Sequence, residues 1–273
     1  MSGFSLSVIG YDGADACVTV PDGTRAIGER AFAGASKTLV EVVVPEGVTA
    51  IGDFAFSGCW KLERITLPST LASVGKGAFR GCSGLIAVTL PSGITRLPDM
   101  AFYGCRHLHE VTLPETLESI GSSCFKQCES LEAVSFPDSL KHVDSGAFQD
   151  CTKLASVAFG AGLETLENAV FQNCSSLATV ELPPSVGWIG QRCFKDCTAL
   201  AHARVPEGVG SLEEGVFANC ANLVDVRVPD SLEFVDRDAF AHCDALKEIE
   251  LTARVALAAG NGLDDCHLVL RAG

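Results

Sequence analysis

The hydrophobic positions of this chain repeat with a period of about 23 residues. Phenylalanine occupies one position of the repeat in ten successive units, and cysteine occupies the position three residues later in most of them. Such a period is typical of a solenoid, in which each unit buries its apolar face against the next. The repeated phenylalanines, evenly spaced except for a slightly longer first step, are Phe32, Phe56, Phe79, Phe102, Phe125, Phe148, Phe171, Phe194, Phe217 and Phe240.

Each unit contains a short run in which apolar and polar residues alternate. In the unit around Leu62, the residues Ile65 and Leu67 share one side of an extended chain, while Arg64 and Thr66 share the other. Pro68 ends the run, because proline cannot donate a hydrogen bond to a neighbouring strand. The pattern predicts one half-buried strand per unit, followed by a turn that leads to the buried phenylalanine.

The repeat predicts one domain with three parts. Residues 1–23 form an N-terminal cap, residues 24–252 form ten units of about 23 residues, and residues 253–273 form a degenerate unit that acts as a C-terminal cap. In this last unit, Leu263, Cys266 and Val269 continue the phenylalanine, cysteine and leucine positions of the repeat.

The segment from Cys82 to Gly104 carries the motif Cys-x-x-Leu-x-x-Val-x-Leu-Pro-x-x-Leu-x-x-Ile-Gly-x-x-Ala-Phe-x-Gly in nearly complete form. This motif closely resembles the BspA-like leucine-rich repeats, and the resemblance covers roughly residues 14–270. It implies a right-handed, curved solenoid with a parallel sheet on the concave side and short turns or helical segments on the other side. It also implies a binding role, often adhesion or recognition at a cell surface.

The charge and hydropathy of the chain disfavour some classes of partner. The net charge of −14 disfavours nucleic acid and anionic lipid, so we expect a protein partner, no nucleic acid and no membrane insertion. No stretch approaches the ~20 apolar residues that span a bilayer, and the first residues lack the features of a signal peptide. The sequence by itself favours a cytoplasmic location, whereas the resembled family is often secreted or exposed on the cell surface, and we leave the compartment open.

The thirteen cysteines are explained best by packing. Ten of them share one repeat position, which Ala35 fills in the first unit, so we expect a column of small buried side chains. A few disulfides between units stay open as an alternative. The pairs Cys124/Cys128 and Cys193/Cys197 resemble metal ligands, but the first member of each occupies a position that is usually alanine. We therefore expect no metal, no cofactor and no catalytic residue.

The exposed strand positions of the concave side are the candidate partner-binding residues, because packing does not restrict their side chains. Small residues dominate the first half of this surface and charged residues dominate its end. Large aromatic side chains occur elsewhere, at Trp60, Tyr103 and Trp188, which offer an alternative edge site. The candidate binding residues are Thr66, Thr89, Thr112, His202, Arg204, Asp225, Arg227, Glu248 and Glu250.

These features favour a non-catalytic scaffold that recognises another protein or mediates adhesion through the concave face. A structural solenoid that assembles end to end is the first alternative, although we expect a monomer. Carbohydrate recognition at a cell envelope is the second alternative. It is disfavoured by the lack of aromatic side chains at the exposed strand positions.

Overall fold

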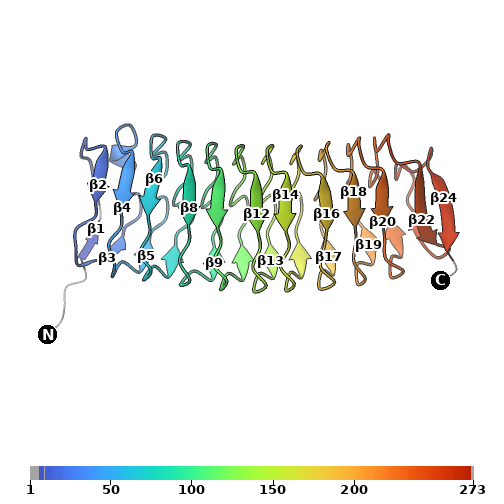
Figure 1. Cartoon of the computed structure of the whole chain (residues 1–273), viewed down its shortest axis with the longest axis horizontal. Helices are drawn as coiled ribbons and strands as arrows, with labels where there is room; N and C mark the ends of the chain where they lie inside the picture. The colour runs from blue at the N-terminus through green and yellow to red at the C-terminus, as the bar shows by residue number, and fades with distance from the viewer. Residues whose placement is uncertain (1–5, 9, 272–273) are drawn as a thin grey trace.

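The computed structural model describes residues 6–8 and 10–271, and Figure 1 shows an elongated stack of rungs with the two ends of the chain at opposite ends of the rod. Parts of the predicted N-terminal cap (1–23) and of the predicted C-terminal unit (253–273) lie outside these residues. The fold is a parallel β-solenoid of about eleven turns, which confirms the predicted fold class. The only helix of the described residues is a single 3₁₀ turn, η1 (Ala33–Ala35).

Even-numbered strands form one ladder of the rod, which we call the even ladder (Figure 1). Most successive strands pair in parallel, so that Thr112 of one rung lies opposite Thr89 of the rung before it. Its strands are β2 (Cys17–Thr19), β4 (Glu41–Val43), β6 (Arg64–Thr66), β8 (Ala87–Thr89), β10 (Glu110–Thr112), β12 (Ala133–Ser135), β14 (Ser156–Ala158), β16 (Thr179–Glu181), β18 (His202–Arg204), β20 (Asp225–Arg227), β22 (Glu248–Thr252) and β24 (His267–Arg271).

Odd-numbered strands form a second ladder, the odd ladder, which runs along the lower side of the rod in Figure 1. Most of its strands have two residues, at the Ile-Gly step where the sequence predicted only a turn. They are β1 (Leu6–Val8), β3 (Thr24–Ile27), β5 (Ala50–Ile51), β7 (Ser73–Val74), β9 (Arg96–Leu97), β11 (Ser119–Ile120), β13 (His142–Val143), β15 (Thr165–Leu166), β17 (Trp188–Ile189), β19 (Ser211–Leu212), β21 (Phe234–Val235) and β23 (Ala256–Leu257).

The repeated phenylalanines form a continuous stack through the core. All ten are buried, and neighbouring ring centroids lie 4.5–5.7 Å apart with nearly parallel planes. The step from Phe32 to Phe56 is longer than the others, so the first unit has an extra residue. This residue lies in the loop between Ala35 and Glu41, which follows the η1 turn.

The register of the last unit differs from the prediction. Val269 lies opposite Glu250, an exposed strand position, and Leu268 lies opposite the buried Ile249. Val269 therefore does not continue the leucine position, and that assignment was wrong. The cause is a shortened unit, because the paired residues Glu248 and His267 are separated by only 19 positions in the sequence. The period of the other units therefore no longer gives the register.

Candidate binding surfaces

The exposed side of the even ladder, which we call the even face, is built by strand alternation. In β16, for example, Val180 points into the core and is buried, whereas Thr179 and Glu181 on either side are exposed. Alternation of this kind places every second side chain of a strand on one face. All nine candidate binding residues lie at such positions of even-numbered strands, and all are exposed.

The structure separates these candidates into two groups. Thr66, Thr89 and Thr112 form a strip on the successive strands β6, β8 and β10, with few atoms beyond their backbone. Four rungs then separate β10 from β18, a distance of about 19 Å at the usual strand spacing. The threonine strip and the charged residues are parts of the same face, and they do not form one compact site.

The charged residues line two adjacent hollows of the even face. The first has a volume of about 290 Å³ and lies between β16, β18 and β20, with His202, Arg204, Asp225 and Arg227 among its lining residues. The second has a volume of about 380 Å³ and lies between β20, β22 and β24. Asp225 and Arg227 line both hollows, so together they make a continuous charged surface.

Ion pairs across this surface are long and exposed. Arg204 Nη1 lies 3.5 Å from Glu181 Oε1, and both His202 Nδ1 and Arg227 Nε lie 3.8 Å from Asp225 Oδ2. Exposed pairs of this kind contribute only about 0–1 kcal/mol each to stability. The side chains can therefore exchange their present partners for those of a bound protein at little cost to the fold.

Arg271 belongs to this surface and was not predicted. Its guanidinium donates a hydrogen bond from Nη2 to the carbonyl oxygen of Val228 at 3.0 Å, and it lies 3.3 Å from Asp230 and 3.8 Å from Glu250. The shortened last unit brings it there, which the period of the repeat could not indicate. Arg271 thereby ties β24 to the loop after β20.

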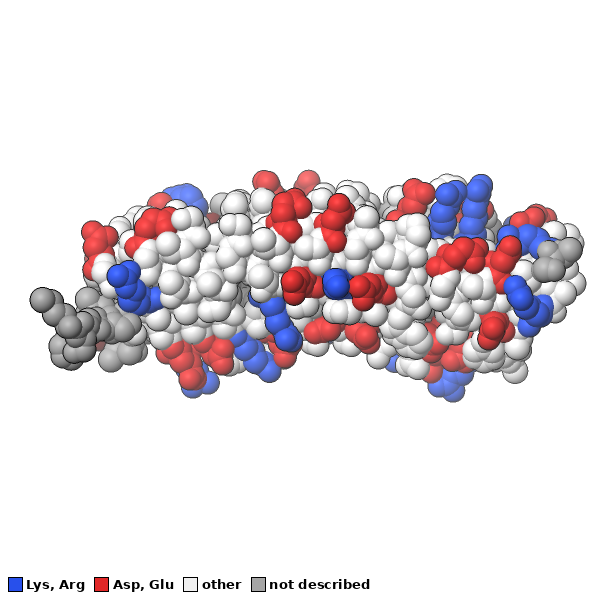
Figure 2. All heavy atoms as spheres, turned by 90° about the horizontal axis from the view of Figure 1, so that it is seen from below, with Lys and Arg blue, Asp and Glu red and all other residues white. Residues whose placement is uncertain are grey.

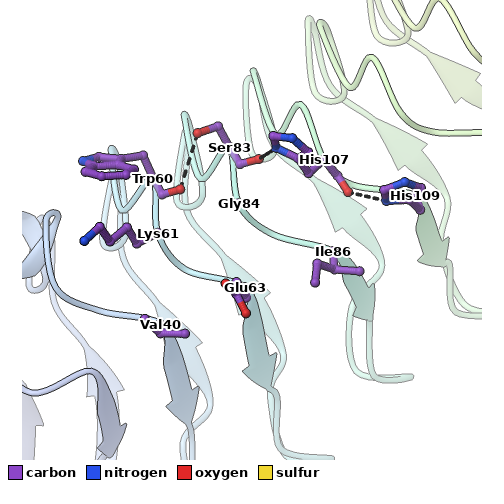
Figure 3. A pocket seen from close by; sticks show the side chains of 9 residues that line it. All are labelled: Val40, Trp60, Lys61, Glu63, Ser83, Gly84, Ile86, His107 and His109. Carbon is purple, nitrogen blue, oxygen red and sulfur yellow. Dashed lines mark hydrogen bonds between the residues drawn. The ribbon is translucent and has the colours of Figure 1, made fainter.

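A separate groove of about 650 Å³ lies at the edge of the even ladder near the N-terminus (Figure 3). Successive units contribute to it, through the turn that follows the buried cysteine position and through the residue directly before each strand. Trp60 is the large side chain of this groove, and 49% of it is exposed. The lining residues are Val40, Trp60, Lys61, Glu63, Ser83, Gly84, Ile86, His107 and His109.

Of the three large aromatic residues of the alternative edge site, only Trp60 lines this groove. Tyr103 lies under the guanidinium of Arg80, whose Cζ is 5.5 Å from the ring centroid. Trp188 lies on β17 of the odd ladder. The three residues lie in three different environments, so they do not form one site.

The two histidines of the Trp60 groove have fixed ring orientations. His107 Nδ1 contacts the carbonyl oxygen of Ser83 at 2.6 Å, and His109 Nδ1 contacts the carbonyl oxygen of His107 at 2.6 Å (Figure 3). A carbonyl oxygen only accepts hydrogen bonds, so Nδ1 carries the proton in both rings. In the neutral imidazole this leaves Nε2 of each ring as an acceptor.

The column of cysteines is buried from Cys59 to Cys243, as predicted, and Ala35 replaces it in the first unit. Cys266 of the last unit is only partly buried, so the prediction was wrong for this member of the column. From Cys59 to Cys243, each thiol of this column donates a hydrogen bond to the phenylalanine carbonyl oxygen of the preceding unit, at 3.1–3.6 Å. Burial raises the pKa of the Cys59 and Cys243 thiols to about 12. Thiols held in the protonated form are poor nucleophiles and poor metal ligands.

Cys124 and Cys193 lie in the same apolar interior, and burial raises the pKa of both thiols above the ordinary range. Among residues 6–8 and 10–271, no three His, Cys, Asp or Glu side chains are placed to hold a metal ion. Within the same residues, no helix is long and apolar enough to cross a bilayer.

Side chains on the face seen from below the rod are mixed in charge. Figure 2 shows acidic groups distributed along its length, with basic groups between them and broad uncharged areas around them. Trp188 and Phe234 are exposed on the odd ladder, at 39% each. Neither residue lines the Trp60 groove or the two charged hollows of the even face.

Three solved structures resemble the chain over most of its length. A leucine-rich cell surface protein from Faecalibacterium prausnitzii A2-165 is 24% identical, with a TM-score of 0.53, over 98% of this chain and 91% of that chain. A leucine-rich repeat protein from Bacteroides ovatus is 26% identical, with a TM-score of 0.53, over 94% and 84% of the two chains. A T. pallidum leucine-rich repeat protein is 32% identical, with a TM-score of 0.51, over 70% and 80%.

No curated protein matches the chain. The model of the BspA type leucine-rich repeat region matches residues 16–132 and 118–247, with six copies of the repeat. These segments cover most of the described rungs and carry the phenylalanine and cysteine columns. The chain belongs to the BspA-type leucine-rich repeat family.

Proposed function

We propose that this protein is a non-catalytic scaffold that binds a protein partner through the C-terminal half of its even face. The observation that carries the proposal is the pair of adjoining hollows between β16 and β24, which charged side chains line without strong pairing among themselves. A surface of this kind presents specific charges on a rigid support. Charge complementarity of that sort governs specificity and the rate of association more than affinity itself.

The threonine strip has a supporting role in this proposal. Its short side chains allow the backbone or an apolar part of the partner to lie close to β6, β8 and β10. Aromatic anchors, which dominate many protein interfaces, do not occur among the candidate residues of the even face. We therefore expect an affinity set by several modest contacts and by orientation.

The proposal is tested with the double variant Arg204→Glu, Arg227→Glu. Candidate partners are captured on the intact chain, crosslinked, and identified by mass spectrometry. Reversing two charges should weaken binding of a true even-face partner by at least about tenfold, because two attractive contacts become repulsive. The crosslinks of the intact chain should map to β16–β24.

Arg96→Glu with Lys153→Glu serves as the matched control, because Arg96 lies on the odd ladder and Lys153 lies in an exposed turn. This control carries the same change in net charge and should retain the partner. Equal loss of binding in both double variants would show that overall charge, rather than the even face, determines binding. Retention by both would place the interface elsewhere on the rod.

A further inference from the structure

The Trp60 groove lies outside the charged surface of the proposed interface, on the first four units of the rod. We propose that it binds one or two sugar units of an uncharged glycan. Its volume of about 650 Å³ lies within the range of ~300–1,000 Å³ that is usual for small-ligand sites. The inference does not depend on the proposed protein-binding function, because no residue is shared between the two surfaces.

Apolar side chains occur in both rows of the groove: Trp60 comes from a turn, and Val40 and Ile86 directly precede strands β4 and β8 (Figure 3). Trp60 is 49% exposed and Ile86 is 46% exposed, although both are large apolar side chains, and Val40 is half-buried. Such exposure is uncommon and marks a binding site when several residues share it. A pyranose ring has a face of C–H groups that stacks on an indole ring, so a sugar can cover the exposed ring of Trp60 and exclude water from it.

Hydrogen-bond acceptors also occur in both rows of the groove, with the two histidines at the end away from Trp60 (Figure 3). His107 and His109 are fixed through Nδ1, so their Nε2 atoms accept in the neutral rings, and the Glu63 carboxylate accepts as well. Figure 3 shows Trp60 at one end of the groove and the two histidines at the other. A ligand that fits has donor groups at one end and an apolar face at the other, which describes a sugar with its hydroxyl groups.

The charges of the groove favour a neutral ligand. Glu63 opposes an anionic sugar, and Lys61 opposes a cationic one. Lys61 Nζ also lies 5.1 Å from the Trp60 ring centroid, so one face of that ring already has a cation. A basic peptide side chain would have to displace it, whereas an uncharged sugar stacks on the free part of the ring.

Gly84 allows two neighbouring turns of the groove to approach closely. A Cβ atom at this position would lie 2.8 Å from the carbonyl oxygen of Trp60, too close for any side chain without a backbone shift. Gly84 therefore lets the Trp60 turn pack directly against the next unit. The same turn is held by Ser83, whose Oγ donates to the Trp60 carbonyl oxygen at 3.4 Å.

The experiment uses the full chain and a panel of named sugars. The neutral probes are the methyl glycosides of glucose, galactose, mannose and N-acetylglucosamine, with lactose, cellobiose and maltose. The charged comparators are sialyllactose and tri-lysine. Binding is followed by saturation-transfer NMR and by fluorescence titration of the variant Trp188→Phe, in which Trp60 is the single tryptophan.

At least one neutral sugar should bind and shift the Trp60 emission. Titration up to about 20 mM sugar allows even millimolar affinity to be detected. Trp60→Ala should weaken this binding by about tenfold or more through loss of the stacking surface. His109→Ala should weaken it several-fold. Trp188→Ala is the matched control and should bind as the parent chain does, and circular dichroism checks that each variant is folded.

The outcomes separate the alternatives. Binding of a neutral sugar that Trp60→Ala abolishes and Trp188→Ala retains supports the proposal. Failure of all seven neutral sugars, equal weakening by both tryptophan variants, or stronger binding of tri-lysine or sialyllactose would overturn it. None of these results bears on the even face, which the Arg204→Glu, Arg227→Glu variant tests separately.

Discussion

A cysteine in this repeat does two things that no other residue type combines. It fills a small apolar space, and its thiol donates a weak hydrogen bond to a phenylalanine carbonyl oxygen of the unit before it, as in Cys151 to Phe125 at 3.2 Å. That carbonyl oxygen already accepts from the backbone N–H of Cys128. Alanine fits the same space, as Ala35 shows, but leaves the second lone pair of the carbonyl without a donor.

These buried thiols make the fold sensitive to alkali. Their pKa values lie above the ordinary value of 9.0 in the folded chain because burial disfavours the thiolate. Below about pH 9 both states are protonated, and the fold loses nothing. As pH rises above 9, the unfolded state ionises first, so the free energy of unfolding should fall by up to about 1.4 kcal/mol per pH unit for each buried thiol.

Urea unfolding between pH 7 and pH 11 measures this effect. Cys151→Ala should reduce stability at pH 7 by about 1–2 kcal/mol and should also make the decline above pH 9 shallower, since one titrating thiol is gone. Cys17→Ser, which removes an exposed thiol outside the column, is the matched control. A stability that is flat from pH 9 to pH 11 would contradict the burial of the column.

At the scale of the element, each unit bends twice around its phenylalanine. From the second unit to the tenth, the residues two before and two after the phenylalanine have positive φ angles, for example Ala169 (57°) and Asn173 (60°) around Phe171. Glycine occupies these positions in several units, at Gly77 and Gly81 around Phe79. Positive φ is costly for residues with a Cβ atom, so the units differ in local strain while sharing one backbone shape.

Ala169→Gly should therefore stabilise the chain, by about 0.5–1 kcal/mol, because removing the Cβ atom relieves strain of about 1–2 kcal/mol at the cost of greater freedom in the unfolded state. Ala161→Gly is the matched control in an exposed turn without positive φ and should be destabilising or neutral. Urea midpoints of the two variants give the comparison. Equal destabilisation by both would show that the positive φ at Ala169 carries no strain.

Sequence periodicity predicted the even ladder because apolar and polar residues alternate over enough positions for a period of two to be recognised. Units such as Leu62 to Leu67 show it clearly. The odd ladder was missed because two residues, such as Ala50 and Ile51, are too few for a period of two to be recognised. Its strands arise from stacking of identical turns rather than from local propensity.

The candidate sites could also be predicted only as far as a repeated sequence pattern reached. Exposure of the nine even-face residues followed from alternation alone, and the structure confirms it. That they bind a partner stays a prediction. The Trp60 groove was not predicted as a unit, because its walls come from two repeat positions that have no role in packing, one at Trp60 and one at Ile86. A large apolar side chain at an exposed repeat position was the only signal in the sequence.

For the whole molecule, each unit contacts mainly its two neighbours, so stability is distributed along the rod and does not depend on one centre. A unit at either end has one neighbour fewer than a unit in the middle. The end-to-end association that the sequence leaves open remains a prediction, and sedimentation equilibrium over a range of concentrations tests it. A mass that stays at one chain would exclude it.

Linear stacking also predicts that the two halves can unfold separately, and the two tryptophans report on them. Trp60 lies in the second unit, and Trp188 lies on β17 in the C-terminal half of the rod. The core substitution Val235→Ala, in β21, removes two methyl groups next to the C-terminal units and should unfold them at lower urea. The transition of Trp188, followed in a Trp60→Phe background, should then precede that of Trp60, followed in a Trp188→Phe background.

The control for this prediction is Phe125→Ala, which opens a cavity in the central unit and should cost about 3–5 kcal/mol. Because the central unit contacts both halves, the two tryptophan transitions should move to lower urea together. Coincident transitions in Val235→Ala as well would mean that the coupling between units exceeds the stability lost at one of them. The rod would then unfold as a single cooperative body, and a partner that binds the even face at β16–β24 would stabilise the Trp60 groove at the far end as much as its own site.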